Sequence, residues 1–340
     1  MTIGRLYYNI AVYSQYTTHS QTSDARFSSA NNTVVIVVDV GSTYYLNMDK
    51  LKTGWFSELT DLLPGRSFSM EVEQVLHKEQ SKFQEILVLK TKSHGVVLVL
   101  DGMIQCTEFD EYSYQEMISF LPLFSHPKPQ RVLIVGGGDG GVAREVAKYP
   151  LVEIIDQVEI DERVIELSKK YLPFMAQGFD NPKVNLHVAD GFKFMEEHFQ
   201  YYDVIITDSS DPIGPATSLF QKSYFELMKR ALRPGGIVCS QADTFWGHLK
   251  NAAAMYNHCK GVFPKAAYAT SYVSTYPAGQ IGFALGSLDE NTDFLNPVHQ
   301  LTNQQRKDMK LRYYTTDIHK AAFVLPAFVI DALDDDENDL

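Results

Sequence analysis

The chain has 340 residues, of which 45% are hydrophobic, and it carries a net charge of −12 at pH 7. This composition supports a full hydrophobic core and excludes a chain that is disordered throughout. The negative charge argues against a general affinity for nucleic acid, and no apolar run reaches the roughly 18 residues of a membrane-spanning helix.

Residues 1–50 form an extension to which we assign no role. The run Thr33–Val40 (TVVIVVDV) predicts one strand. The segment lacks the apolar core and the cleavage site of a signal peptide, whereas Arg5, Arg26 and the frequent Ser and Thr leave a transit peptide open. We favour a variable extension over a transit peptide.

Residues 51–127 are expected to form a small N-terminal antiparallel β-domain. Three strand-like runs come first, at residues 67–80, 83–92 and 94–106. Asp101-Gly102 inside the last run is typical of a hairpin turn. A helix is expected at Asp110–Phe124, and the prolines at 127 and 129 mark a linker into the next domain.

The segment Arg131–Gly141 (RVLIVGGGDGG) predicts a nucleotide site. Val132–Val135 is a short apolar run, as in a strand buried on both faces of a parallel sheet. A helix is expected over residues 140–149. The glycines at 136, 138 and 141 fit the pattern G-x-G-x-x-G, in which the backbone turns sharply and approaches a bound nucleotide closely.

Strands and helices alternate through residues 128–333, which predicts a Rossmann-like α/β domain with a mainly parallel sheet. The strands expected after the first are residues 152–160, 184–190, 202–208 and 235–242. The helices expected between them are residues 161–172, 191–199 and 220–232. Residues 266–273 and 280–287 are expected to close the sheet as a hairpin, and the acidic tail 334–340 to be solvated.

Acidic residues stand where four successive parallel strands are expected to end, namely Asp139, Glu159 with Asp161, Asp190, and Asp208. Ligands bind at the carboxyl ends of such strands, so we expect these side chains along one edge of the sheet. Any single Asp there can instead be a helix N-cap, and this alternative stays open for Asp190 before the helix at Phe192. Four in succession favour an anionic binding site.

The position of Asp139 separates two classes of nucleotide. A dinucleotide places its pyrophosphate at the helix N-terminus after the glycines, where a carboxylate would repel it. A sulfonium nucleoside of the S-adenosylmethionine type has no phosphate and carries an amine that this carboxylate can pair with. Glu159, 21 residues after Gly138, is placed to accept the ribose hydroxyls, and Asp190 to accept an adenine amino group.

Asp208 and Asp211 predict where an alkylamine would bind, since they stand three residues apart in a loop directly after a buried strand. A protonated amine is attracted by carboxylates but must lose a proton before it can attack. A positioned Asp can take that proton and hold the amine in line. Tyr114 and Tyr276 can add ring faces or hydroxyls for a cation, and a packing role stays open for each.

Taken together, these motifs resemble those of the spermidine synthase family, and the resemblance covers about residues 53–330. The motifs that carry it are GWFSE (54–58), SKFQEILV (81–88), LDGMIQCTEFDEYSYQEM (100–117), GGGDGG (136–141), EID (159–161), ADG (189–191), TDSSDPIGP (207–215), TYPAGQIGF (275–283) and DIHKAAFVLP (317–326).

The resemblance implies a seven-stranded, mainly parallel sheet of the methyltransferase type after the small β-domain, and a homodimer in the cytoplasm. It implies aminopropyl transfer from decarboxylated S-adenosylmethionine to putrescine, giving spermidine and 5'-methylthioadenosine. The nucleoside is a co-substrate, and no cofactor, metal, nucleic acid or membrane partner is implied. The three widely spaced cysteines indicate a reducing compartment and show no metal-ligand spacing.

The same resemblance gives each candidate site residue a role. The donor nucleoside is expected on Gln84, Gln115, Asp139, Glu159, Ile160, Asp190 and Gly191. Putrescine is expected on Tyr114, Asp208, Asp211 and Tyr276, with Asp208 as the general base. Ser209–Ala216 is expected to form a gating loop.

Two residues depart from the family's pattern, and one of them concerns the acceptor. Leu63 stands where many eukaryotic members have Trp beside the acceptor, and Phe83 where Tyr is usual. The acceptor's length, including spermidine as an acceptor, therefore stays open. Two other functions also stay open: an amine N-methyltransferase, and a catalytically silent homologue that binds a partner protein. The intact Asp139, Asp208 and Asp211 argue against the silent homologue.

Overall fold

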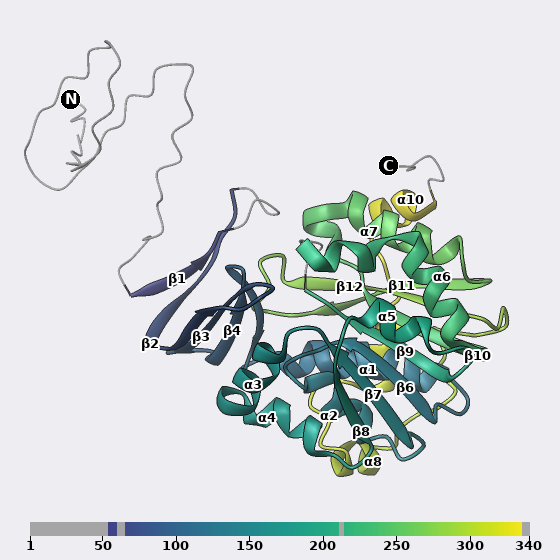
Figure 1. The fold of residues 1–340 in the computed structure, drawn as a ribbon. Helices are drawn as coiled ribbons and strands as arrows, with labels where there is room; N and C mark the ends of the chain where they lie inside the picture. The colour runs from purple at the N-terminus through teal and green to yellow at the C-terminus, as the bar shows by residue number, and fades with distance from the viewer. Residues whose placement is uncertain (1–53, 60–64, 211–213, 335–340) are drawn as a thin grey trace, which may run out of the picture. The chain divides into compact units, whose positions relative to one another are not determined.

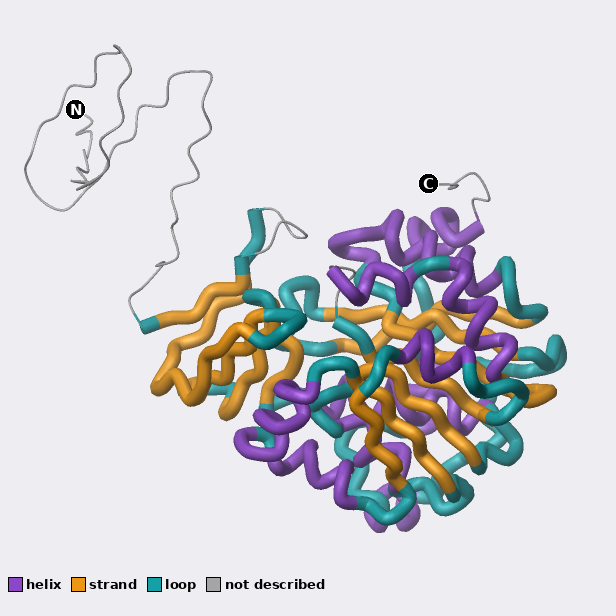
Figure 2. Tube along the Cα trace, in the orientation of Figure 1, coloured by secondary structure: helices purple, strands orange, loops and turns teal. Residues whose placement is uncertain are grey.

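The computed structural model describes residues 54–59, 65–210 and 214–334. These described residues form one compact unit. It contains a small antiparallel sheet and a larger sheet with helices on both faces (Figures 1 and 2). This is the predicted fold class. The strand predicted at residues 33–40, Leu63, Asp211 and the acidic tail beyond residue 334 lie outside the described residues.

The small sheet has the strand order β1-β2-β3-β4-β5, and every neighbouring pair is antiparallel. Its strands are β1 (Trp55–Glu58), β2 (Phe68–Gln80), β3 (Glu85–Thr91), β4 (Gly95–Leu100) and β5 (Met103–Thr107). The predicted hairpin is confirmed: Asp101 and Gly102 join β4 to β5 with φ of +48° and +80°, as a turn of type I′ requires. The analysis of the sequence missed β1 as a strand.

The larger sheet has the order β11-β12-β10-β9-β6-β7-β8. Its parallel strands are β6 (Arg131–Gly136), β7 (Ile154–Glu159), β8 (Val184–Val188), β9 (Tyr202–Asp208) and β10 (Leu232–Gln241). The predicted hairpin is β11 (Lys265–Tyr272) with β12 (Gln280–Ser287), which pairs antiparallel to β10. Strands β7 and β8 follow β6 on one side, whereas β9 and β10 lie on its other side. The strand order therefore switches between β6 and β9, and such a switch point opens a crevice for a ligand.

Strand β6 is buried on both faces, as its apolar run predicts. Val132 and Ile134 belong to the core beneath α1 and α2, whereas Leu133 and Val135 belong to the core beneath α5, α6 and α7. Figure 1 shows these helices covering the two faces of the sheet. The bounds are α1 (Glu111–Ser125), α2 (Gly141–Ala147), α5 (Gly191–Glu196), α6 (Lys222–Ala231) and α7 (Phe245–Lys260).

The remaining helices include α3 (Glu162–Tyr171) and α4 (Pro173–Ala176), and, towards the C-terminus, α8 (Asn303–Asp308), α9 (Thr316–Ala321) and α10 (Ala327–Asp334). Helices α7 to α10 were not predicted. Each helix within residues 54–59, 65–210 and 214–334 is too short or too polar to span a bilayer.

The two sheets are joined by a shared apolar cluster. Ile86, Val88 and Leu98 of the small sheet pack with Val164 and Leu167 of α3. Burial of each such side chain contributes about 1.5–3 kcal/mol to the free energy of unfolding. This cluster therefore holds the small sheet against the domain that contains the larger sheet. The predicted boundaries at residues 50/51, 127/128 and 333/334 stay predictions.

The glycine turn is fixed against the strand that carries Asp208. The register of β6 and β9 places Gly136 opposite Asp208, and the Gly137 amide donates to the Asp208 carbonyl oxygen with an N···O distance of 2.9 Å. Gly136 has φ of +84°, and a Cβ there would collide with the same carbonyl oxygen. Only glycine meets both conditions.

Gly136→Ala should therefore lower the free energy of unfolding by more than about 3 kcal/mol, because a collision with backbone adds to the strain of a left-handed residue. Gly102→Ala is a matched control, since Gly102 has φ of +80° but a Cβ there meets no atom within 4 Å. We expect the control to cost only about 1–3 kcal/mol. Urea denaturation measures both, and equal losses would contradict the steric argument.

Candidate active site

A cavity of about 590 Å³ opens where the parallel strands end, and it extends to the small sheet. Its volume is in the range of small-molecule sites. Every predicted site residue that the structure describes lines it, namely Gln84, Tyr114, Gln115, Asp139, Glu159, Ile160, Asp190, Gly191, Asp208 and Tyr276. Their roles stay predictions. Ser209, Ser210 and Ala216, at the two sides of the undescribed residues 211–213, also line the cavity.

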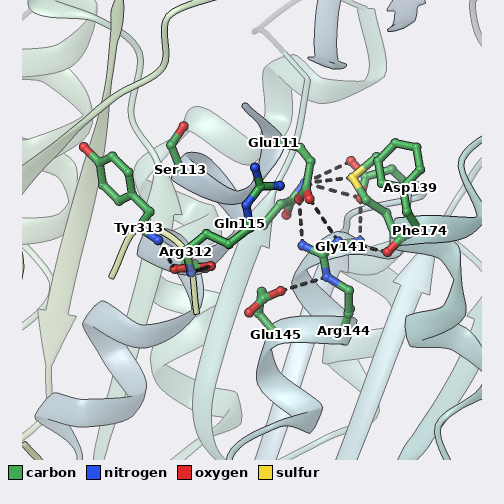
Figure 3. Close-up of polar contacts among 12 residues, drawn as sticks. Glu111, Ser113, Gln115, Asp139, Gly141, Arg144, Glu145, Phe174, Arg312 and Tyr313 are labelled. Carbon is green, nitrogen blue, oxygen red and sulfur yellow. Dashed lines mark hydrogen bonds and ion pairs between the residues drawn. The ribbon is translucent and has the colours of Figure 1, made fainter. Parts of the chain in front are cut away.

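Asp139 is held in the glycine turn by two donors. The Gly141 amide donates to its Oδ1 at 2.6 Å, and Gln115 Nε2 donates to its carboxylate at 3.2 and 3.4 Å (Figure 3). Burial raises the pKa of this carboxyl, while these donors and the charge of Arg144 lower it. Gln115 Oε1 is buried and has no hydrogen-bond partner in the described part of the chain, so it can accept from a bound amine.

Glu159 lies at the end of β7, 9% exposed, where burial raises the pKa of its carboxyl to about 7. Its Oε1 accepts from the Asp161 amide at 2.8 Å. Asp161 itself does not line the cavity: its side chain caps α3 by accepting from the Arg163 amide, so for this residue the N-cap alternative is correct.

Gln84 reaches the cavity from the loop between β2 and β3. Its Nε2 donates to Asp161 Oδ2 at 3.0 Å, and Ser81 Oγ donates to the same oxygen at 2.6 Å. The small sheet thus supplies one wall of the cavity, and Asp161 fixes that wall against the end of β7.

Asp190 caps a helix and also lines the cavity. Its Oδ1 accepts from the Phe192 amide at 2.9 Å, which makes it the N-cap of α5. It also lines the cavity together with Gly191 and Ile160. Capping orients the carboxylate, so one side chain can close the helix and face a ligand.

Asp208 ends β9, and its Oδ1 accepts from the Tyr114 hydroxyl at 2.7 Å. Burial, and after it the negative charge of Asp139, raise the pKa of this carboxyl to about 8, although the Tyr114 bond lowers it. Tyr114 is buried on α1, and burial raises the pKa of its phenol well above the usual range. A neutral phenol therefore donates to this carboxylate.

Tyr276 lies in the loop between β11 and β12. Its hydroxyl donates to the Gln105 carbonyl oxygen at 2.9 Å, and its ring stands edge-on to the Tyr114 ring with centroids 6.3 Å apart. The two tyrosines thus form an aromatic corner beside Asp208.

Three acidic residues that line the cavity were not predicted as site residues, namely Glu58, Asp101 and Asp243. Of these, Asp243 is the one near the end of a parallel strand. It follows β10 directly, with φ of +58°, and its carboxylate accepts from the Thr244 amide at 2.6 Å and lies 3.1 Å from His248 Nδ1. The rule that located the other acids, a carboxylate at the end of a parallel strand, applied to this fifth strand would have found it.

A buried arginine ties together the helices that carry these groups. Arg144 of α2 makes two bonds to Glu111 of α1, at 3.0 and 2.7 Å, one to Glu145 at 2.7 Å and one to the Phe174 carbonyl oxygen at 3.0 Å (Figure 3). The side chains of Arg144 and Glu111 are 13% and 5% exposed. Glu111 lies one helical turn before Gln115, so this ion pair joins the helix that carries Gln115 to the helix that follows Asp139.

The cavity is thus lined by carboxylates and aromatic rings, a combination that attracts a cation and disfavours an anion. Three of these carboxyls have raised pKa values, chiefly because they are buried, and for Asp208 the charges of Asp139 and Glu159 raise the pKa further. Such an arrangement can bind a sulfonium or an ammonium group, and it can take up a proton from the ammonium. Among residues 54–59, 65–210 and 214–334, no group of His, Cys, Asp and Glu has the geometry to hold a metal ion.

Two family models match the chain. The model described as "Spermine/spermidine synthase domain" matches residues 111–296, and the one described as "Spermidine synthase tetramerisation domain" matches residues 54–108. Together the two matches span both sheets.

Characterised relatives are similar over most of the chain. Spermidine synthase of Dictyostelium discoideum is 54% identical over 281 residues, which cover 83% of this chain and 98% of that protein. Spermine synthase of Saccharomyces cerevisiae is 48% identical over 286 residues, which cover 82% and 95%.

A solved structure shares the fold. A crystal structure of spermidine synthase in complex with the transition-state analogue AdoDATO superposes with a TM-score of 0.76 and 30% sequence identity, covering 87% of this chain and 98% of that one.

Asp208→Asn should stabilise the folded chain at pH 8. The pKa of about 8 lies above the ordinary 3.8, so the folded state binds this proton more tightly than the unfolded state does. The stability that Asp208 contributes is therefore present below pH 4 and is lost as the pH rises towards 8. Asparagine does not ionise, so the variant loses no stability in this way as the pH rises. Thermal melts should show the variant at least ~2 °C above the wild type at pH 8, and closer to it at pH 5.

Asp308→Asn is the control for that experiment, because Asp308 is an exposed carboxylate on α8 outside the cavity. It should change the melting temperature little at either pH. A lower melting temperature for Asp208→Asn at pH 8 would contradict the charge crowding inferred here.

Arg144→Met should lower the free energy of unfolding by about 3–5 kcal/mol, because it leaves Glu111 buried without its cation and leaves Glu145 with Lys148 alone. Arg163→Met is a matched control: Arg163 also pairs with two glutamates, Glu79 and Glu166, but its side chain is 45% exposed. An exposed pair contributes at most about 1 kcal/mol. If urea denaturation gives equal losses of unfolding free energy for the two variants, the argument from burial of the Arg144 ion pairs is contradicted.

Proposed function

The chain belongs to the spermine/spermidine synthase family, and on that premise we propose that it transfers an aminopropyl group from decarboxylated S-adenosylmethionine to putrescine, with Asp208 as the general base. The products are spermidine and 5'-methylthioadenosine.

The observation that carries this proposal is that Asp139 and Asp208 face the same cavity. Asp139 lies inside the glycine turn, where the tail of a sulfonium nucleoside would extend. A methionine carboxylate would be repelled there, whereas the amine left after decarboxylation forms a charge-assisted pair. This supports the decarboxylated donor over ordinary S-adenosylmethionine, and so aminopropyl transfer over N-methylation.

The donor's nucleoside is proposed to lie along the ends of β6, β7 and β8. Glu159 is placed for the ribose hydroxyls and Asp190 for the adenine amino group, with Ile160 and Gly191 beside the base. Gln84 closes the site from the small sheet. Gln115 stands between the two substrates, where its Oε1 is available to an ammonium.

The acceptor is proposed to lie between Asp208 and the aromatic corner of Tyr114 and Tyr276. The Tyr114 hydroxyl holds the Asp208 carboxylate in one orientation, and the rings offer faces to an ammonium group. Asp211, which follows Asp208 by three residues, is proposed to contribute a second carboxylate, and residues 209–216 to close over the site.

In the proposed step, Asp208 takes a proton from one ammonium of putrescine. The neutral nitrogen then attacks the aminopropyl carbon bonded to sulfur, so that a C–N bond forms as the C–S bond breaks. The electron pair of the broken bond returns to sulfur, which leaves neutral methylthioadenosine and a secondary ammonium. A base with a pKa of about 8 is matched to proton transfer near neutral pH.

Spermidine is the second candidate acceptor, favoured by the similarity to the spermine synthase of Saccharomyces cerevisiae. The D. discoideum spermidine synthase is the more similar of the two relatives, which supports putrescine. Leu63 is proposed to adjust acceptor length, because it stands where the family has a Trp beside the acceptor.

The assembly is proposed to be a homodimer, with support from the tetramerisation-domain match over residues 54–108. A cytoplasmic location is proposed from the three unpaired, buried cysteines, which are typical of a reducing compartment.

Purified protein incubated with decarboxylated S-adenosylmethionine and putrescine should release methylthioadenosine and spermidine in equal amounts. Ordinary S-adenosylmethionine should give no methylated diamine, and spermidine as the acceptor should give less product than putrescine. Asp208→Asn should lower kcat by about 10²–10⁴-fold, the range for a positioned base. Chromatography of the amines and of the nucleoside product measures each of these reactions.

Asp203→Asn is the matched control, since Asp203 lies near the start of the same strand and outside the cavity. It should keep most of the activity. Absence of methylthioadenosine with the wild type would refute the proposed reaction. If calorimetry also shows no binding of methylthioadenosine, a silent homologue is favoured. Normal turnover of Asp208→Asn would show that Asp208 is not the base.

A further inference from the structure

Asp110 occupies the N-cap position of α1 but does not cap that helix: its side chain makes no capping hydrogen bond. Aspartate at this position ordinarily accepts from amides of the first helical turn. Asp110 is only 5% exposed, so its carboxylate must find its partners elsewhere in the protein.

Those partners come from two distant segments. Oδ1 accepts from the Thr107 hydroxyl at 2.8 Å, at the end of β5. Oδ2 accepts from the Ser274 hydroxyl at 2.8 Å and from the Thr275 amide at 2.9 Å, in the loop between β11 and β12. One carboxylate therefore joins the small sheet, the start of α1 and this loop.

The loop that Asp110 holds carries Tyr276, the residue after Thr275. Within the loop the Tyr276 amide donates to the Val273 carbonyl oxygen at 3.2 Å, and the Gly279 amide donates to the Tyr276 carbonyl oxygen at 2.7 Å. These bonds shape the turn, but they do not tie it to the rest of the cavity. The Asp110 bonds and the Tyr276 hydroxyl on Gln105 make that connection.

The same carboxylate also stands one helical turn before Tyr114, which bonds to Asp208. A further contact supports this end of α1, because the Ser271 hydroxyl donates to the Ser113 carbonyl oxygen at 3.0 Å. Asp110 therefore contacts both segments that carry the aromatic corner: it starts the helix of Tyr114, and it holds the loop of Tyr276.

We propose that Asp110 is a positioning residue for the acceptor: it sets Tyr276 and Tyr114 at the separation and angle that the acceptor ammonium requires. This inference rests on the proposed function. It makes Asp110 neither a base nor a substrate ligand, and Asp110 does not line the main cavity.

A merely structural carboxylate would affect both substrates alike, and the chain offers one for comparison. Asp203 is 6% exposed and accepts from the Gln130 and Arg131 amides at 2.9 and 2.8 Å and from Arg233. Its burial and bonding match those of Asp110, but it lies at the opposite end of β9 from Asp208.

The test compares Asp110→Ala with Asp203→Ala in steady-state kinetics with each substrate varied. Asp110→Ala should raise KM for putrescine on the order of tenfold, because a displacement of about 1 Å at a substrate contact costs this much or more. KM for decarboxylated S-adenosylmethionine should stay within about twofold. Asp203→Ala should lose comparable stability and change neither KM selectively.

Asp110→Asn is the conservative variant, and it carries the test if Asp110→Ala fails to fold. Its remaining oxygen can serve the Thr275 amide while its amide group donates to Thr107, so it should restore most of the putrescine KM. In a Tyr276→Ala background, Asp110→Ala should raise the putrescine KM by a smaller factor than it does in the wild type, since part of its effect passes through that ring.

Three results would overturn the inference: an equal rise in both KM values, an unchanged putrescine KM in every Asp110 variant that folds, or full additivity with Tyr276→Ala. If the wild type forms no product, the proposed function fails by itself. Hydrogen exchange over residues 273–279 then still decides the positioning role, because it should accelerate in Asp110→Ala and not in Asp203→Ala.

Discussion

Burial of Asp139, Glu159 and Asp208 around one cavity raises the pKa of all three carboxyls, to about 7 for Glu159 and about 8 for Asp208. Like charges held together in a partly buried site are unfavourable until a cation joins them. The folded chain therefore holds an electrostatic cost that a sulfonium donor and an ammonium acceptor relieve. In the proposed reaction, this single arrangement both attracts the cationic substrates and supplies the base.

The rest of the architecture keeps the carboxylates from moving apart. The register of β6 with β9 places the glycine turn against Asp208, so that the turn and the strand share one hydrogen bond. Arg144 supplies a buried cation behind the site, where it pairs with Glu111 instead of competing for Asp139. The small sheet adds Gln84 through Asp161. A preorganised polar site of this kind needs little rearrangement when its ligands bind.

Much of the fold could be predicted from the sequence, because strands β6 to β10 are short apolar runs bounded by glycines and acids. Strand β9 spans the predicted residues 202–208. Helix α7 could not, since Gly247 and a non-helical backbone at His248 interrupt its periodicity. In the candidate site, the acids at strand ends were predictable from the rule for parallel sheets, and Asp243 was missed only because the rule was not extended to β10.

The sequence by itself determined the alternation of strands and helices, the glycine turn and the acidic character of the sheet edge, because periodicity and backbone freedom depend on a few neighbouring residues. Only the tertiary structure decided which groups meet: Tyr114 with Asp208 across 94 residues, Gln84 with Asp161 across 77, and Asp110 with Thr275 across 165. Such pairs depend on strand order and helix packing, which no local propensity specifies.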